Sequence, residues 1–317
     1  MYPLKFEPIL KQTLWGGDKI IPFKHLNSDL KGVGESWEIS GVEDNESVVA
    51  NGPDKGLTLA DMVRKYREEL VGEANYARFG NKFPLLIKFI DAKQDLSIQV
   101  HPADDLAKKR HNSMGKTEMW YVVDAEEGAY LYHGFKKEIS KDEFAKRIEE
   151  DTLLEVLNKV PVHKGDVFFI EAGTIHAIGK GLIIAEIQQN SNVTYRVYDY
   201  GRVGKDGKKR ELHIEKALDV TNRASAKKDG SHYPHIADCD YFTVDKLNLD
   251  GKTFNKMEGT VSEKSFLSIL VLDGEGEITS NGERVSYKKG DSIFLTAGSG
   301  EYSVEGVCDA LITTIRE

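Results

Sequence analysis

The 317-residue sequence is poor in cysteine and has no surplus of positive charge. Its two cysteines, Cys239 and Cys308, match no CxxC spacing and predict two free thiols in a reducing compartment. The formal net charge of −9 at pH 7 argues against nucleic acid or an anionic membrane as a partner, because both favour proteins with surplus Lys and Arg. The negative net charge still allows an anionic small molecule as a ligand, because such a ligand needs only a few local cations.

The sequence also contains no long apolar run, and we expect no secretory leader. No apolar run reaches the roughly 18 residues that a membrane-spanning helix needs. The first ten residues, MYPLKFEPIL, lack the pattern of a signal peptide. We therefore expect a cytoplasmic protein with no membrane partner, either a monomer or a homodimer.

Short segments rich in β-branched and aromatic residues dominate the sequence, each bounded by Gly, Asp, Asn or Pro. Their spacing is too tight for intervening helices, which disfavours parallel βαβ units and predicts an all-β dominated sandwich or barrel. Helices are predicted at 57–72, at 140–159, where Ser140 and Glu143 have capping-box spacing, and more briefly at 102–110. The predicted strands are 34–41, 84–90, 96–102, 118–124, 128–135, 166–173, 182–189 and 193–201.

A diverged internal repeat divides the chain. The segment from Lys164 resembles the one from Lys289, 125 residues later, and the run from Val122 resembles that from Val271, 149 residues later. The offsets differ by 24 residues, the length of a helical insertion predicted at 136–159 in the first copy. We predict a larger lobe of residues 1–235 and a smaller, metal-free lobe of residues 236–317, joined by a linker at 222–235.

Four polar residues of the larger lobe form a candidate metal site. Gln99 and His101 are two apart in a predicted strand, so they point to the same face. Glu118 begins the next strong strand, and His176 follows a glycine turn. Two imidazoles, a carboxylate and an amide oxygen suit Zn²⁺, with Fe²⁺, Mn²⁺ or Co²⁺ possible.

The second copy of the repeat supports this interpretation. All nine histidines precede residue 236, and the repeat aligns Glu118 with Leu267 and His176 with Glu301. Each candidate taken singly is more often structural, but a scaffold that retains the turn and drops the ligands indicates that the ligands serve function. The sequence therefore predicts a metal ion in the first lobe.

Three cations lie in or beside apolar strands. Arg196 in the aromatic strand 193–201 either contacts an anion or pairs with a carboxylate such as Asp199. Lys88 interrupts an apolar strand, and Lys116 lies two residues before Glu118. Each lysine is also compatible with a surface position from which its ammonium group reaches water.

The ordered motifs LWGG, GESWEIS, PLLIKFIDAKQDLSIQVHP, GKTEMWYV, EAGTIHAI and NVTYRVYDYGR resemble the type I mannose-6-phosphate isomerases, and most closely their short bacterial form. The resemblance covers essentially the whole chain. It implies two cupin lobes, each a double-stranded β-helix or jelly roll, with a few short helices inserted in the first. It also implies one Zn²⁺ per chain and interconversion of mannose 6-phosphate and fructose 6-phosphate through a cis-enediol intermediate.

The resemblance also implies roles for individual residues. The family's metal ligands fall on Gln99, His101, Glu118 and His176. We assign catalysis to Arg196 and Lys116, and substrate binding to Ser97, Lys88 and Glu186. The base that moves the proton stays open between Lys116, Lys88, Glu186 and a metal-bound water.

Two positions depart from the longer family members, which carry a histidine where Gly115 stands and an aspartate where Asn192 stands. A mechanism that uses those side chains is therefore in doubt for this chain. The alternatives are a non-catalytic cupin that binds sugar phosphates, a cupin-type glucose-6-phosphate isomerase, and an Fe²⁺ cupin oxygenase. An oxygenase is disfavoured because a fourth protein ligand leaves fewer positions for O₂.

Overall fold

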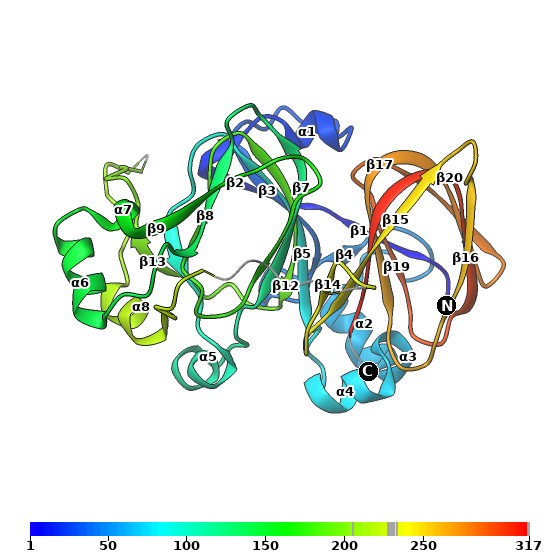
Figure 1. Ribbon diagram of the computed structural model, residues 1–317. Helices are drawn as coiled ribbons and strands as arrows, with labels where there is room; N and C mark the ends of the chain where they lie inside the picture. The colour runs from blue at the N-terminus through cyan, green and yellow to red at the C-terminus, as the bar shows by residue number, and fades with distance from the viewer. Residues whose placement is uncertain (205, 227–231, 233, 316–317) are drawn as a thin grey trace.

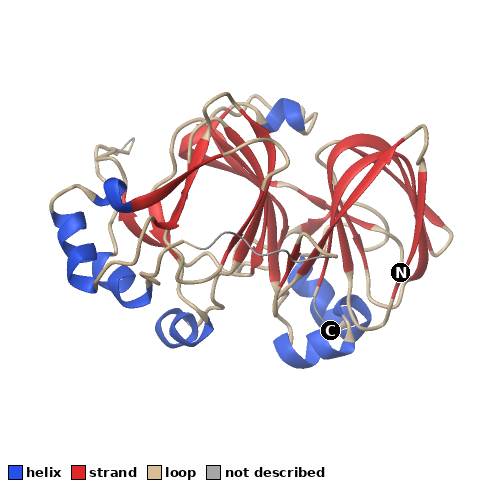
Figure 2. Ribbon diagram, in the orientation of Figure 1, coloured by secondary structure: helices blue, strands red, loops and turns tan. Residues whose placement is uncertain are grey.

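The computed structural model describes residues 1–204, 206–226, 232 and 234–315. Two β-rich lobes lie side by side, and most helices lie at the outer end of the first lobe and below the two lobes (Figures 1 and 2). The predicted all-β dominated fold is confirmed. The predicted linker at 222–235 lies partly outside the described residues.

The first lobe is built from two antiparallel sheets. A six-stranded sheet has the order β10-β7-β12-β5-β2-β3, and a five-stranded sheet has the order β13-β6-β11-β8-β9. The six strands are β2 (Ile9–Gly17), β3 (Val33–Ser40), β5 (Leu85–Ala92), β7 (Glu118–Ala125), β10 (Val167–Ile170) and β12 (Leu182–Gln189). The five strands are β6 (Ile98–Val100), β8 (Tyr130–Phe135), β9 (Leu157–Pro161), β11 (His176–Ile178) and β13 (Tyr195–Tyr198).

The second lobe is one nine-stranded sheet that includes two strands from the start of the chain. Its main order is β14-β15-β20-β17-β19-β1-β4, with β16 on β20 and β18 on β17. Strands β1 and β4 therefore belong to the second-lobe sheet, although they precede the predicted lobe boundary between residues 235 and 236. That boundary remains a prediction. The strands are β1 (Leu4–Glu7), β4 (Val48–Val49), β14 (Ala237–Asp238), β15 (Thr243–Asp250), β16 (Lys256–Val261), β17 (Leu267–Ser280), β18 (Glu283–Lys288), β19 (Ser292–Leu295) and β20 (Gly300–Thr314).

Backbone hydrogen bonds show that the sequence repeat is a structural repeat. The Val122 amide donates to the Asp166 carbonyl at 2.9 Å, and the Val271 amide donates to the Asp291 carbonyl at the same distance. These pairs are related by the two offsets found in the sequence. The repeated segments therefore occupy equivalent places in the two lobes.

The predicted insertion lies between β8 and β9. Helices α6 (Lys141–Glu149) and α7 (Leu153–Val156) fill it, whereas β17 and β18 are joined by a tight turn at Asn281 and Gly282. The helix predicted at 140–159 is too long, because Leu157 begins strand β9, which pairs with β8.

The helix predicted at 57–72 is also divided. Arg67, with φ of +49°, ends α2 (Leu59–Tyr66) and precedes α3 (Glu68–Val71). The short helix predicted at 102–110 is α5 (Asp104–His111). Among the described residues, no helix is both long and apolar enough to cross a membrane. The remaining helices are α1 (Ile20–Phe23), α4 (Glu73–Phe79) and α8 (Ile214–Val220).

Helix capping also differs from the prediction. Ser140 accepts a hydrogen bond from the Glu143 amide, but only this half of the predicted capping box is present among the described hydrogen bonds. A reciprocal capping box forms instead at Thr58 and Asp61, at the start of α2.

The largest hydrophobic core lies between the lobes. It joins Leu85 and Phe83 of the first lobe to Phe266 and Phe294 of the second. The Phe266 and Phe294 rings stack with centroids 4.9 Å apart. The lobes therefore share apolar packing, whereas the interior of the first barrel combines an apolar cluster around Trp120 with buried polar side chains such as Glu118 and Glu186.

Candidate active site

The four candidate ligands converge inside the first barrel. Register pairs Gln99 of β6 with His176 of β11, His101 follows β6, and Glu118 begins β7. One ligand atom each from His101, Glu118 and His176 lies within 4.8 Å of the others, and all three side chains are at most 1% exposed. The Glu118 carboxylate lies 3.3 Å from His176 Nε2 and 3.7 Å from His101 Nε2.

Backbone carbonyls orient both imidazoles. His101 Nδ1 lies 3.0 Å from the Val193 carbonyl and His176 Nδ1 lies 2.8 Å from the Thr174 carbonyl, which assigns the proton to Nδ1 and leaves Nε2 as the lone-pair donor. Burial lowers the pKa of His101 well below its usual value and lowers that of His176 to about 3. Both rings are therefore neutral at pH 7, as ligation requires.

The donor set fits a divalent cation. Glu118 Oε1 is buried and has no hydrogen-bond partner among the described residues. Lys116 Nζ lies 2.7 Å from the other Glu118 oxygen and 3.1 Å from His101 Nε2, so an ammonium group already contacts these donors. The Gln99 amide lies 3.4 Å from His176 Nε2 and can present its oxygen after a rotation of the amide plane.

The predicted substrate-handling residues line one cavity next to these ligands. Its volume is about 540 Å³, and it is open to solvent. Cations and carboxylates share its wall with aromatic and hydroxyl side chains from β2. The predicted residues that line it are Ser97, Lys88, Gln99, Lys116, Glu186 and Arg196.

A row of alternating charges crosses strands β3, β5 and β12. Register pairs Lys88 with Glu186, and Lys88 Nζ lies 3.0 Å from Glu186 and 3.4 Å from Glu35. Burial raises the pKa of Glu186, and the nearby Glu118 raises it further. Burial acts to lower the pKa of Lys88, but the two neighbouring carboxylates outweigh it and raise that pKa above its usual value.

Arg196 is half-buried at the opposite wall. Its Nη1 donates to the Glu211 carbonyl at 2.9 Å, and its buried Nε has no partner among the described residues. The alternative pairing with Asp199 is not observed, because Arg202 and Arg210 take that carboxylate. Burial and the neighbouring Arg210 charge lower the pKa of Arg196.

Comparison with known proteins decides the family. The model "Phosphomannose isomerase type I, catalytic domain" matches residues 4–138, and "Mannose-6-phosphate isomerase, cupin domain" matches residues 233–315. Mannose-6-phosphate isomerase ManA of Bacillus subtilis (strain 168) is 38% identical, with 98% of each chain covered. The chain belongs to the type I mannose-6-phosphate isomerase family.

Other mannose-6-phosphate isomerases are similar to this chain over its full length. Mannose-6-phosphate isomerase of Streptococcus mutans is 36% identical, with 99% of each chain covered. The crystal structure of mannose 6-phosphate isomerase from Bacillus subtilis superimposes with a TM-score of 0.88 at 32% identity, covering 99% of each chain. The predicted cupin fold is therefore confirmed.

Sequence reasoning missed two cavity residues of this family member. Glu35 lies within GESWEIS and pairs with Lys88, although nothing in its spacing distinguishes it from a surface carboxylate. Arg210 lines the cavity from the basic segment 204–213, which the sequence alone predicts to be an exposed hairpin loop. The mixed charges of GESWEIS and PLLIKFI on adjacent strands were the available signal for Glu35.

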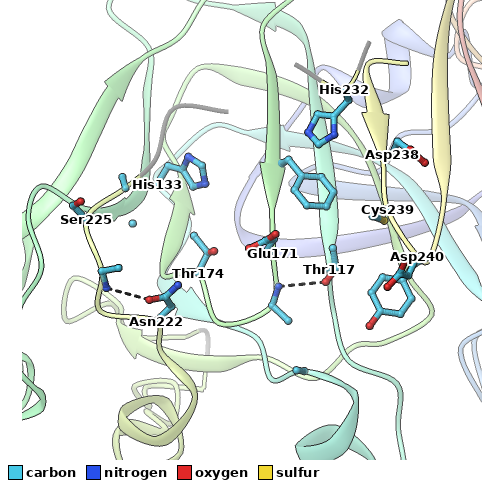
Figure 3. Close-up of a pocket in the computed structure, with 17 residues that line it drawn as sticks. Thr117, His133, Glu171, Thr174, Asn222, Ser225, His232, Asp238, Cys239 and Asp240 are labelled. Atoms are coloured by element: carbon cyan, nitrogen blue, oxygen red, sulfur yellow. Dashed lines mark hydrogen bonds between the residues drawn. The ribbon is translucent and has the colours of Figure 1, made fainter. Parts of the chain in front are cut away.

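A second cavity of about 650 Å³ lies close to the ligands without containing them. Figure 3 shows Thr117 and Thr174 on its wall, each close in sequence to a candidate ligand, with Cys239 and Asp240 of the second lobe on the same side of the cavity as Thr117. Thr117 Oγ1 accepts a hydrogen bond from the Ala172 amide. This cavity therefore adjoins the segments that precede Glu118 and His176.

Proposed function

We propose that the chain is a zinc-dependent aldose–ketose isomerase that interconverts mannose 6-phosphate and fructose 6-phosphate. One observation carries the proposal: a buried set of two neutral imidazoles and a carboxylate adjoins a 540 Å³ cavity lined by Lys116, Glu186, Lys88 and Arg196. The printed names of the full-length relatives support the substrate. We further propose one zinc ion per chain, a cytoplasmic location, and a monomer or homodimer.

The reaction moves a proton between C1 and C2 of the open-chain sugar through a cis-enediol(ate). That species carries negative charge, so stabilising it lowers the barrier. Zinc held by Gln99, His101, Glu118 and His176 would polarise the sugar oxygens as a Lewis acid. Arg196, whose Nε has no protein partner among the described residues, would stabilise the developing oxyanion.

The electrostatics narrow the choice of proton carrier. The raised pKa of Lys88 keeps it protonated, which removes it as a base and suits it to binding an anionic substrate beside Ser97. The raised pKa of Glu186 brings its basicity nearer to working pH. We propose that Glu186 carries the proton between the carbons, while Lys116, 4.0 Å from Glu186, holds a proton at the sugar oxygens.

A coupled assay tests this function, with mannose 6-phosphate or glucose 6-phosphate as substrate and metal content measured in parallel. We expect turnover of mannose 6-phosphate, about one zinc per chain, and loss of turnover after chelation. Thermal stabilisation by the sugar phosphate without turnover would support the non-catalytic cupin instead. Turnover of glucose 6-phosphate alone would support the glucose-6-phosphate isomerase.

A further inference from the structure

A tyrosine of the second lobe contacts the segment that carries the candidate ligands. Tyr241 lies in the turn between β14 and β15, and its hydroxyl donates to Asp104 Oδ2 at 2.9 Å. Asp104 is the first residue of α5 and follows His101 by three positions. Because Asp104 is in the first lobe, this hydrogen bond crosses between the lobes.

The other carboxylate oxygen of Asp104 binds the segment that precedes Glu118. Asp104 Oδ1 accepts from the Gly115 amide at 2.7 Å and from Gln189 Nε2 at 2.9 Å. Gln189, at the end of β12, accepts from the Thr117 amide at 2.9 Å through its own Oε1. The Asp104 carboxylate therefore joins α5, β12 and the start of β7 in one network.

Three consecutive amides before Glu118 are fixed in this way. Gly115 donates to Asp104, Lys116 donates to the Pro102 carbonyl at 3.2 Å, and Thr117 donates to Gln189. Two of the three bonds depend on the Asp104–Gln189 pair. Since Lys116 and Glu118 flank Thr117, their side-chain positions follow from where these amides are held.

The packing around Gly115 leaves no room for a side chain at this position. A Cβ at position 115 would come within 2.7 Å of the Asp104 amide nitrogen and 2.9 Å of the Ala103 carbonyl carbon. Either contact would push the segment away from Asp104. The close approach of Gly115 and the charge-assisted bond to Asp104 therefore belong together.

We infer that Tyr241, acting through Asp104, is a positioning residue by which the second lobe holds Lys116 and Glu118 in place. The second lobe lacks histidine, yet it supplies an outer hydrogen-bond partner of the site. Helix α4 also holds this turn, because Arg78 donates to the Asp240 carbonyl at 2.8 Å, and Figure 3 shows Asp240 on the same side of the second cavity as Thr117. The inference rests on the proposed metal site for its functional consequence.

The test compares Tyr241→Phe with the control Tyr287→Phe. Tyr287→Phe also removes a tyrosine hydroxyl, but that hydroxyl donates to the Val307 carbonyl at 3.1 Å within the second lobe and does not contact Asp104. Zinc affinity is measured by competition with a chromogenic chelator, and exchange of the Gly115 and Thr117 amides is measured in zinc-free protein. Removal of a group that bonds a metal ligand directly typically costs about 10- to 100-fold in metal affinity. Tyr241 acts farther from the ligands, so we expect about threefold to tenfold weaker zinc binding for Y241F and faster exchange at both amides.

In Y287F, the zinc affinity and the exchange rates of the Gly115 and Thr117 amides should stay within about twofold of the wild type. Zinc affinity and amide exchange in Y241F that match the wild type would overturn the inference. If Y241F does not fold, Asp104→Asn provides the same test within the first lobe, with the same expected and contradicting results. A wild type that binds no zinc would defeat the proposed function, whereas amide exchange at Gly115 and Thr117 would still decide this inference.

Discussion

At the scale of single residues, the balance of buried charge explains why this site suits a cation and an anionic substrate together. Two ammonium groups, Lys88 and Lys116, face three carboxylates, Glu35, Glu118 and Glu186. With all five ionised the cluster carries a net charge of −1, and a divalent ion changes it to +1. The occupied site would then attract a phosphate ester and the negative charge of an enediolate.

Replacement of Glu186 by Gln should separate proton transfer from metal binding. Gln can still accept the hydrogen bond that Trp120 Nε1 makes at 2.8 Å, but it cannot take up a proton. We expect kcat to fall by about 100-fold or more, the usual contribution of a general base, with KM and zinc content nearly unchanged. Steady-state kinetics with metal analysis measures this.

Glu35→Gln is the matched control, because Glu35 also contacts Lys88 but lies farther from it. Its effect on kcat should be much smaller. Wild-type kcat in Glu186→Gln would assign the proton to another group, with Lys116 the first to examine.

The buried His176 should make zinc-free protein less stable in acid. Its folded-state pKa of about 3 lies below the value of about 6.5 expected in an unfolded chain. Between these values the unfolded chain binds a proton that the folded chain does not, so the free energy of unfolding falls as pH falls. Urea unfolding at pH 7, 6 and 5 should show a shallower decline in His176→Gln than in the wild type.

His163→Gln serves as the control for this series, because the His163 side chain is 84% exposed. It should retain the wild-type decline. Equal slopes in His176→Gln and the wild type would contradict the burial argument.

At the scale of elements, most strand positions were predictable and strand partners were not. Alternation and turn residues identify eight strands of the first lobe, and the repeat offsets identify the insertion that became α6 and α7. They do not identify β2, β9 or β11, and the start of β9 was predicted as helix. The break at Arg67 was missed because no glycine marks its positive φ. The place of β1 in the distant sheet of the second lobe depends on tertiary packing that local pattern does not encode.

The same distinction holds for the candidate site. Gln99 and His101 were predictable because period-two alternation puts them on one strand face, and the repeat contrast drew attention to His176. Asp104 and Tyr241 were not, because their importance arises from a contact between residues 137 positions apart. Local periodicity carries no information about such a partner.

The capping box of α2 should contribute measurably to stability. The Asp61 amide donates to the Thr58 side-chain oxygen, and the Thr58 amide donates to the Asp61 carboxylate. Helix α2 buries Leu59, Met62 and Val63 in the core shared by the lobes. Thr58→Ala should lower the free energy of unfolding by about 1 kcal/mol. Ser140→Ala, which removes a single capping bond of α6, should cost less, and an equal or larger loss there in urea unfolding would contradict the argument.

At the scale of the whole molecule, strand pairing, a buried lysine and a shared apolar core join the two lobes. β1 pairs with β19, so the start of the chain is bound into the far sheet. The buried Lys24 ammonium contacts Glu38 of the first lobe at 2.7 Å and also the Gly290 carbonyl of the second lobe. With Tyr241 and the shared core, these contacts predict that the lobes unfold together.

Phe294→Ala tests this cooperativity with a probe that belongs to one lobe. Phe294 is fully buried in the second-lobe sheet and packs against Phe83 and Phe266, whereas all three tryptophans (Trp15, Trp37 and Trp120) lie in the first lobe. Truncating a buried Phe costs about 3–5 kcal/mol. If unfolding is cooperative, tryptophan fluorescence and far-ultraviolet circular dichroism should show the same lowered urea midpoint. A fluorescence midpoint equal to that of the wild type, together with an earlier dichroism transition, would mean that the second lobe unfolds by itself and that the shared core does not couple the lobes.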